Sequence, residues 1–215
     1  MPIPFNANRK TDTFVRSVPR QIAGFDPVHW NVSSPKILAT FRRILGTAKD
    51  ERPLQRFFQE NPIALATGLL RPHTVWVIPW PSLPLPGTGG GIPDFILCEW
   101  SSIGPQWIIV ELESPKKSPV TKSGVSAICN HAAEQINRYK TYIRDNALFL
   151  RDNGFPWIHG ECEGVIVIGR RSDPNRGEHS QRLAEFRRQH IEVASYDGLL
   201  EIFAETQERI RTRGL

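Results

Sequence analysis

Ile-Pro-Asp-Phe-Ile-Leu-Cys-Glu-Trp at residues 92–100 and Trp-Ile-Ile-Val-Glu-Leu-Glu at residues 107–113 are the two runs that decide the fold. Both are short, apolar and rich in β-branched or aromatic residues, which is typical of strands. The link between them contains Ser, Gly and Pro, so we expect a hairpin or two neighbouring strands of one sheet. The second run is apolar at every position from Trp107 to Val110, which predicts a central strand covered on both faces.

Three carboxylates lie at the ends of these predicted strands: Asp94, Glu111 and Glu113. Residues two apart on a strand point to the same face, roughly 6.5 Å from each other. Glu111 and Glu113 therefore share a face, and Asp94 can join them from the neighbouring strand. Such carboxylates are costly to bury unless they are paired or bind a cation. Three oxygen ligands suit a hard cation such as Mg²⁺ or Mn²⁺, whereas no CxxC pair indicates a soft N/S site.

The order of these residues resembles the core of the PD-(D/E)XK nucleases, including the Pro93-Asp94 pair. Gln135 and Tyr139, on the predicted helix that follows, look like the Q-x-x-x-Y element of the RecB-like branch of that superfamily. A closer resemblance is to the Shedu family of bacterial anti-phage nucleases. The similar stretches occur in the family's order at residues 54–62, 110–115, 121–126, 131–135, 164–170 and 196–200.

This resemblance implies a metal-dependent DNA endonuclease or nickase in bacterial anti-phage defence, with Mg²⁺ or Mn²⁺ as cofactor and a homo-oligomeric assembly. It implies Asp94 and Glu111 as metal ligands, and Glu113 as a third ligand or as the group that positions the attacking water. The family pattern usually has Lys where this chain has Glu113, and that Lys orients the water and offsets phosphate charge. Either Lys117 or Lys122 could supply the missing cation. We favour Lys122 for this role and place Lys117 among the DNA contacts.

Several further residues are site candidates with ordinary structural alternatives. Gln135 and Tyr139 lie one helical turn apart on one face, and His131 lies one turn earlier. We expect Gln135 to orient a ligand carboxylate or a phosphate. Tyr139 suits core packing or phosphate contact equally, and His131 is more often a packed or partly exposed side chain than a base. Arg170 and Arg171 follow a Gly-bounded strand and are predicted to grip a DNA backbone bidentately, with surface charge as the alternative.

Composition restricts the class of protein. The 215 residues are 40% hydrophobic and 23% charged, which is typical of a globular chain of one domain. The net charge of +5 suits a polyanion such as DNA but is shared by many other proteins. Three scattered Cys favour a reducing compartment. No apolar run is typical of a signal peptide or a membrane span, so we expect a cytoplasmic protein without membrane contact.

We expect the chain to divide into an N-terminal arm at residues 1–33 and a PD-(D/E)XK nuclease-like domain at residues 34–215. The arm is polar and aperiodic, so we expect a surface arm or a short edge strand, with a DNA-touching or subunit-exchanging arm as the alternative. Ser34 is the predicted N-cap of a first helix, and Asp50 opens a second. Glu60, near the end of the second helix, is a possible site residue, although a solvated side chain is the more ordinary interpretation.

The remaining pattern predicts the fold class. A Gly-rich loop at residues 81–91 lacks the Gly-Lys-Ser/Thr ending of a phosphate loop and precedes a strand, so we expect no nucleotide cofactor. Ser126 begins a helix, strands follow at residues 164–169 and 191–196 with a basic helix between them, and Asp197 is the predicted cap of the last helix. This order predicts an α/β fold with a mixed central sheet flanked by helices, as the PD-(D/E)XK resemblance also implies.

Two other functions are compatible with the sequence. Glu113 in place of Lys could mark a catalytically weakened module that binds DNA or senses DNA ends without cutting. A thiol enzyme using Cys129 and His131 is the weakest alternative, because helical residues two apart do not face each other.

Overall fold

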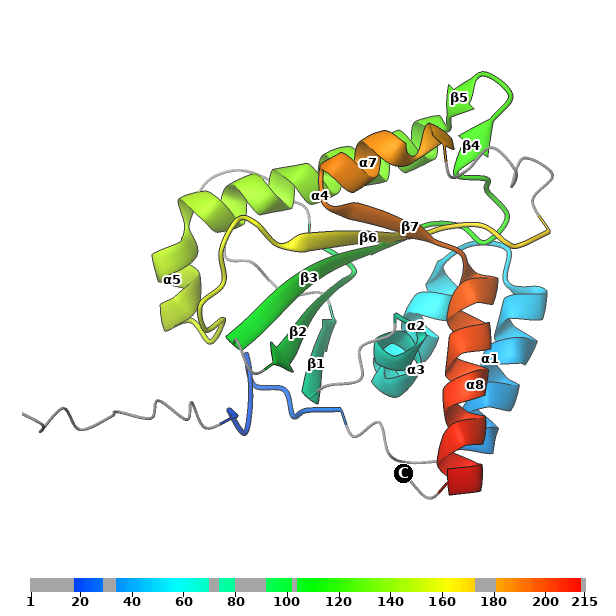
Figure 1. Cartoon of the computed structure of the whole chain (residues 1–215), viewed down its shortest axis with the longest axis horizontal. Coiled ribbons are helices and arrows are strands. Elements are labelled where there is room, and N and C mark those ends of the chain that lie inside the picture. Colours follow the sequence, from blue (N-terminus) through cyan, green and yellow to red (C-terminus); the bar gives the residue numbers. More distant parts are fainter. Residues whose placement is uncertain are drawn as a thin grey trace, which may run out of the picture.

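The strands predicted from the sequence form one mixed sheet (Figure 1). In the computed structural model, which describes residues 18–28, 34–69, 74–79, 92–101, 104–172 and 181–213, five strands pair in the order β1-β2-β3-β6-β7. They are β1 (Thr74–Pro79), β2 (Phe95–Ser101), β3 (Gly104–Leu112), β6 (Glu163–Val167) and β7 (Ile191–Ala194). Neighbours among the first three are antiparallel, whereas β3, β6 and β7 are parallel. The predicted mixed α/β sheet is confirmed.

The predicted hairpin is formed by β2 and β3 in the middle of this sheet. Its antiparallel register pairs Phe95 with Val110 and Ser101 with Gly104. β3 lies between β2 and β6, and helices cover its side chains on both faces of the sheet. Residues 107–110 are at most 2% exposed, as expected of a central strand.

The parallel pairing of β3 and β6 requires a crossover connection. It contains a small hairpin of β4 (Val120–Thr121) and β5 (Gly124–Val125), then α4 (Ala127–Asp145) and α5 (Ala147–Asp152). The small hairpin and α5 do not follow from the sequence, because they are too short to show a period. Helix α4 lies close on β6 at Gly164, where a Cβ would be 2.6 Å from Cγ2 of Ile136. Only glycine permits that approach.

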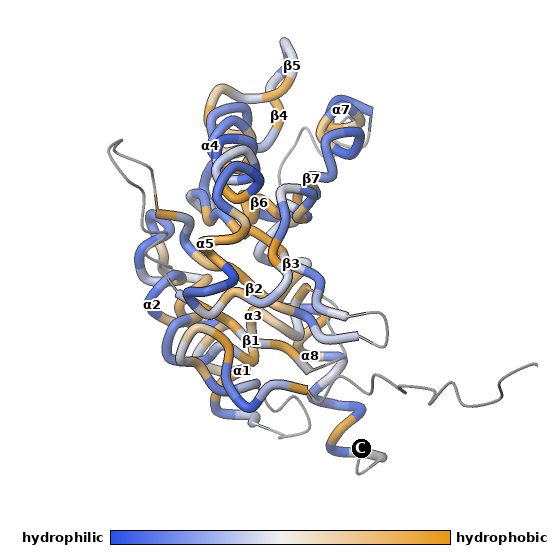
Figure 2. Tube along the Cα trace, turned by 90° about the vertical axis from the view of Figure 1, so that its left-hand side faces the viewer, coloured by the Kyte–Doolittle hydropathy of each residue, from blue (hydrophilic) through white to orange (hydrophobic). Residues whose placement is uncertain are grey.

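Helices cover both faces of the sheet, as predicted. Alternate side chains of β3 point to opposite faces: Trp107 and Ile109 pack with α4 and α5, whereas Ile108 and Val110 pack in the second core cluster. The helices of that second cluster are α1 (Pro35–Thr47), α2 (Arg52–Glu60), α3 (Pro62–Gly68) and α8 (Tyr196–Arg213). Figure 2 shows the hydrophobic segments gathered along the strands, between α4 on one side and α1 and α2 on the other. A short helix, α7 (Ala184–Arg188), precedes β7 within the predicted basic helix.

The ends of the helices agree only partly with the predicted caps. The Ser126 hydroxyl accepts a hydrogen bond from the Cys129 N–H at 3.2 Å and begins α4 as predicted. Ser34 is the N-cap residue of α1 as predicted, but its hydroxyl makes no capping hydrogen bond. Its backbone N–H donates to Oε1 of Gln207 at 2.5 Å. The predicted cap at Asp197 is wrong. The Ser195 hydroxyl accepts from the Gly198 N–H at 3.2 Å instead, because the Asp197 carboxylate is occupied by arginines.

Part of the predicted N-terminal arm packs against the sheet. Ile22 is buried in the core beneath α4, and the Val28 N–H donates to the Val75 carbonyl at 2.7 Å. The predicted edge strand around residues 13–15 and the Gly-rich loop at residues 81–91 lie outside the described residues. Among the helices that the structure describes, none combines the length and apolar character needed to cross a membrane.

Candidate active site

The hairpin register brings Asp94 and Glu111 together. Phe95 pairs with Val110, so the next antiparallel position sets Asp94 opposite Glu111. Because side chains alternate along a strand, Glu111 points to the face that α4 covers. Asp94 lies in a bend just before β2, and its carboxylate accepts a hydrogen bond from Gln55 of α2. The backbone N–H of Leu112 donates to Oδ2 of Asp94 at 2.8 Å and ties the two strand ends together.

Glu113 extends the acidic cluster beyond the end of β3. Its backbone N–H donates to the Val167 carbonyl at 2.8 Å, and its carbonyl accepts from the hydroxyl of the buried Tyr196, also at 2.8 Å. The backbone of Glu113 is thus held between β6 and α8. Its side chain is half-buried.

The three carboxyl groups share one electrostatic environment. Burial, followed by the charges of Asp94 and Glu113, raises the pKa of Glu111 to about 8. Burial and the charges of Glu51 and Asp94 raise the pKa of Glu113 to about 7. Burial, together with the charge of Glu51, raises the pKa of Asp94 to about 6. Each group therefore holds its proton at a higher pH than an exposed carboxyl would.

Glu111 carries the clearest sign of a missing partner. Its side chain is 6% exposed, and Oε1 has no hydrogen-bond partner. A buried carboxylate oxygen without a donor costs free energy, and a hard cation is the kind of partner that carboxylate oxygens suit. Among the described residues, no group of three or more His, Cys, Asp or Glu side chains is arranged to hold a metal ion. The ligand set of Asp94, Glu111 and Glu113 stays a prediction.

Helix α2 adds two groups that the sequence interpretation missed. Nε2 of Gln55 donates a hydrogen bond to Oδ1 of Asp94, and Glu51 acts on both Asp94 and Glu113 through its charge. The sequence contained a signal for this pair: Glu51 and Gln55 are four residues apart, and residues at this spacing share one face of a helix. Glu60 lies nine residues beyond Glu51, about 13 Å further along the helix axis, and is exposed. The structure therefore brings Glu51, and not Glu60, to the carboxylates.

Helix α4 contributes Tyr139 to the site. Tyr139 is 5% exposed, and its hydrogen bond to Glu111 lowers the pKa of that carboxyl against the larger effect of burial. Tyr139 thus packs in the core and also contacts a site carboxylate. Gln135 is half-buried one turn earlier, and His131 is exposed, which fits the ordinary interpretation of this histidine.

The thiol alternative is wrong. Cys129 is fully buried, and burial together with the charge of Glu113 raises the pKa of its thiol to about 12. A thiol with such a pKa is not a nucleophile near neutral pH. The effect of Glu113 on Cys129 also shows that the acidic cluster lies near the first turn of α4.

Two lysines predicted to meet phosphate lie on exposed turns. Lys117 follows β3, and Lys122 lies between β4 and β5, where the small hairpin projects beyond the start of α4 (Figure 1). The turn of Lys122 is held by the Thr121 carbonyl, which accepts a hydrogen bond from Arg182. Neither lysine amine forms an ion pair within the described part of the chain.

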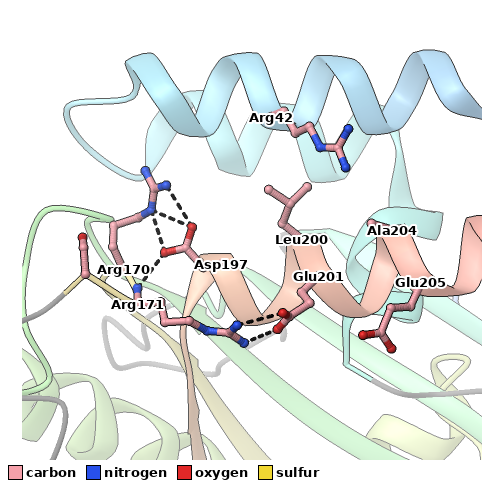
Figure 3. A pocket seen from close by; sticks show the side chains of 9 residues that line it. Arg42, Arg170, Arg171, Asp197, Leu200, Glu201, Ala204 and Glu205 are labelled. Atoms are coloured by element: carbon pink, nitrogen blue, oxygen red, sulfur yellow. Dashed lines mark hydrogen bonds and ion pairs between the residues drawn. The ribbon is translucent and has the colours of Figure 1, made fainter.

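Arg170 and Arg171 do not present free guanidinium groups to DNA (Figure 3). Nε and Nη2 of Arg170 donate to the Asp197 carboxylate at 2.9–3.1 Å, and Nη1 donates to the Leu45 carbonyl at 2.9 Å. The guanidinium of Arg171 binds both carboxylate oxygens of Glu201. These carboxylates belong to α8, so both guanidinium groups take part in bonds that hold α8 and α1 to the end of β6. Their contact with phosphate stays a prediction.

The arginine pairs line a groove of about 540 Å³ between α1 and α8. Burial would raise the pKa of Asp197, but the hydrogen bonds from Arg170 and from the Arg171 N–H outweigh burial and lower it. This groove lies on the α8 side of the sheet, whereas Glu111 points toward α4.

Comparison with protein families matches residues 48–200 to the family described as Shedu protein SduA, C-terminal. The matched range contains all three carboxylates together with Glu51 and Gln55. The comparison with curated proteins gives no match.

Proposed function

The chain belongs to the Shedu family, which supports a role in anti-phage defence, and we propose that it is a metal-dependent DNA endonuclease or nickase with a PD-(D/E)XK-like fold. One observation carries this proposal: the ends of two paired strands bring together Asp94, Glu111 and Glu113, whose pKa values are all raised, and Oε1 of Glu111 is buried without a hydrogen-bond partner among the described residues. Such an arrangement is costly in a folded protein unless a cation offsets the charge.

Asp94 and Glu111 would hold Mg²⁺ or Mn²⁺, with Glu113 beside them as a third ligand or as the group that positions water. These donors fit, because Mg²⁺ is usually bound by one or two carboxylates together with waters and substrate phosphate oxygens. When bound, the cation would polarise the phosphodiester and lower the pKa of a bound water.

The protein's own groups would orient the reactants and move the proton. A Glu113 carboxylate with a pKa of about 7 can accept a proton from an attacking water near neutral pH. The Tyr139 hydroxyl would keep Glu111 in place through its hydrogen bond. The exposed amines of Lys117 and Lys122 would approach the DNA backbone and offset phosphate charge, a role that the family pattern gives to a lysine at the position of Glu113.

We propose that the substrate is DNA, that the protein assembles as a homo-oligomer and that it is located in the cytoplasm. The net charge of +5 and the exposed Lys117 and Lys122, which form no ion pair with a residue that the structure describes, support a polyanionic partner. No nucleotide cofactor enters this proposal.

The test is incubation of the protein with linear, nicked and supercoiled DNA in Mg²⁺, Mn²⁺ or EDTA. We expect cleavage in the metal ions and none in EDTA, and we expect Asp94→Ala to abolish it because a ligand of the cation is lost. Asp152→Ala is the matched control, since Asp152 is an exposed carboxylate on α5. Full cleavage by Asp94→Ala would refute the assignment.

The second candidate is a DNA-binding or DNA-end-sensing module with weakened catalysis. Glu113 in place of the usual lysine favours it. This module would bind DNA with an affinity that falls steeply with salt and would nick no DNA in either metal ion. Glu113→Lys would then be the variant to prepare.

A further inference from the structure

We propose that Gln55 is a positioning residue that holds the Asp94 carboxylate in the orientation needed to bind the cation. This inference rests on the proposed function, because it assigns a role within the same site. It concerns α2, which supplies none of the three carboxylates predicted from the sequence.

The two oxygens of Asp94 are held by donors from two different elements. Nε2 of Gln55 on α2 donates to Oδ1, and the backbone N–H of Leu112 on β3 donates to Oδ2 at 2.8 Å. Two fixed donors on one carboxylate determine both of its side-chain torsions. A carboxylate has about four lone-pair sites, so each oxygen of Asp94 keeps capacity for a further partner opposite Glu111.

The helix that carries Gln55 is firmly anchored. Leu54, Phe57 and Phe58 are at most 2% exposed, and the ring of Phe57 stacks on Phe41 of α1 with centroids 5.1 Å apart. The link between α1 and α2 is held by the Ser114 hydroxyl, which donates to the Lys49 carbonyl at 3.3 Å. The amide of Gln55 is therefore presented to Asp94 from a rigid support.

A neutral amide suits this position better than a charged side chain. A lysine would form an ion pair with Asp94 and compete with the cation. A glutamate would add repulsion to a cluster that already contains Glu51, the residue just before α2. Glutamine donates a hydrogen bond without changing the charge of the site. Groups that orient a metal ligand in this way commonly contribute about 10–100-fold to metal affinity or activity.

The experiment is calorimetric titration of the DNA-free protein with Mn²⁺, combined with cleavage rates measured across a range of Mn²⁺ concentrations. For Gln55→Ala we expect the Mn²⁺ dissociation constant and the half-maximal Mn²⁺ concentration to rise about 10-fold. The cleavage rate at saturating Mn²⁺ should stay within about twofold of the rate of the unsubstituted protein. A high Mn²⁺ concentration fills the weakened site, and Gln55 takes no part in the reaction itself. A general loss of folded protein would lower that rate and leave the dissociation constant unchanged.

Gln21→Ala is the matched control, because Nε2 of Gln21 also donates to an aspartate, Oδ1 of Asp26, at 3.0 Å on an exposed surface. Its Mn²⁺ affinity should equal that of the unsubstituted protein. Gln55→Met keeps the length of the side chain without a donor and serves as the test if Gln55→Ala does not fold. Unchanged Mn²⁺ affinity in the folded Gln55 variant would overturn the role of Gln55 alone. An unsubstituted protein that neither binds Mn²⁺ nor cleaves DNA would overturn the proposed function and this role with it.

Discussion

Glu111 and Glu113 lie at the C-terminal end of β3, and Arg170 and Arg171 follow the C-terminal end of the neighbouring parallel strand β6. Both places gather charge at the same edge of the sheet. Beyond β6, Asp197 and Glu201 of α8 each bind a guanidinium, and the pKa of Asp197 is lowered. Beyond β3 the carboxyl groups face one another, and the pKa of Glu111 is raised to about 8.

The contrast is between charged groups that stabilise the fold by pairing with each other and charged groups that repel each other. The arginine pairs join β6, α1 and α8 without any ligand. The acidic cluster instead lowers the stability of the folded chain when its carboxyl groups are ionised, because its charges are half-buried and unmatched. A protein that keeps such a cluster requires another reason for it, and cation binding supplies one.

The largest expected effect on stability is that of Glu111→Gln in EDTA. The pKa of Glu111 is raised in the folded state, so the folded state binds more protons than the unfolded one, and its stability is lost as pH rises from about 4.5 toward 8. Removing this charge should raise the free energy of unfolding by roughly 1–4 kcal/mol at pH 8 and change it little at pH 4.5. Urea unfolding at both pH values measures the difference.

Glu60→Gln makes the same chemical change at an exposed site and should leave the free energy of unfolding unchanged at both pH values. Equal effects of the two substitutions would contradict the description of Glu111 as a buried group under repulsion. Added Mn²⁺ should stabilise the unsubstituted protein more than Glu111→Gln, which sharpens the contrast with the arginine cluster.

A smaller effect is expected for Arg170→Ala. This substitution removes the guanidinium from the half-buried Asp197 carboxylate, which keeps the Arg171 N–H, and from the Leu45 carbonyl, so the free energy of unfolding should fall by about 2 kcal/mol. Thermal or urea unfolding measures the loss. The Mn²⁺ affinity should not change, because Arg170 bonds to the α8 side of the sheet. A tighter or weaker Mn²⁺ site in a folded Arg170→Ala protein would break the proposed separation of the two clusters.

The smallest effect is expected for Arg171→Ala. Arg171 and Glu201 are both about 40–50% exposed, and exposed ion pairs contribute little to stability. We expect a similarly small change in the free energy of unfolding and no change in DNA affinity, measured by fluorescence anisotropy at low salt. A DNA affinity that falls several-fold would restore the phosphate contact predicted from the sequence.

Local features of the chain were predictable because they depend on near neighbours. The β2–β3 hairpin follows from two apolar runs and a short turn, and its geometry alone places Asp94 beside Glu111. The cap at Ser126 follows from a hydroxyl placed before a helical period. The helical faces that pack on the sheet follow from the spacing of residues such as Leu54 and Phe58.

The partners of the charged groups were not predictable in this way. Arg170 follows a strand in the same manner whether its guanidinium meets DNA or Asp197, and the deciding carboxylate lies 27 residues further along the chain. Glu51 and Glu60 both lie on or beside α2, and only the packing of this helix decides which end lies near Asp94.

The sequence by itself determined the β2–β3 hairpin, a mixed sheet and the closeness of the three carboxylates at its edge, because short-range periodicity and turn residues control register. The tertiary structure alone decided that Gln55 and Glu51 join this site and that Arg170 and Arg171 do not present free guanidinium groups. Those outcomes depend on how helices separated in sequence dock on the sheet. Docking is set by the burial of whole apolar faces, and a polar side chain acquires its partner only once that docking is complete.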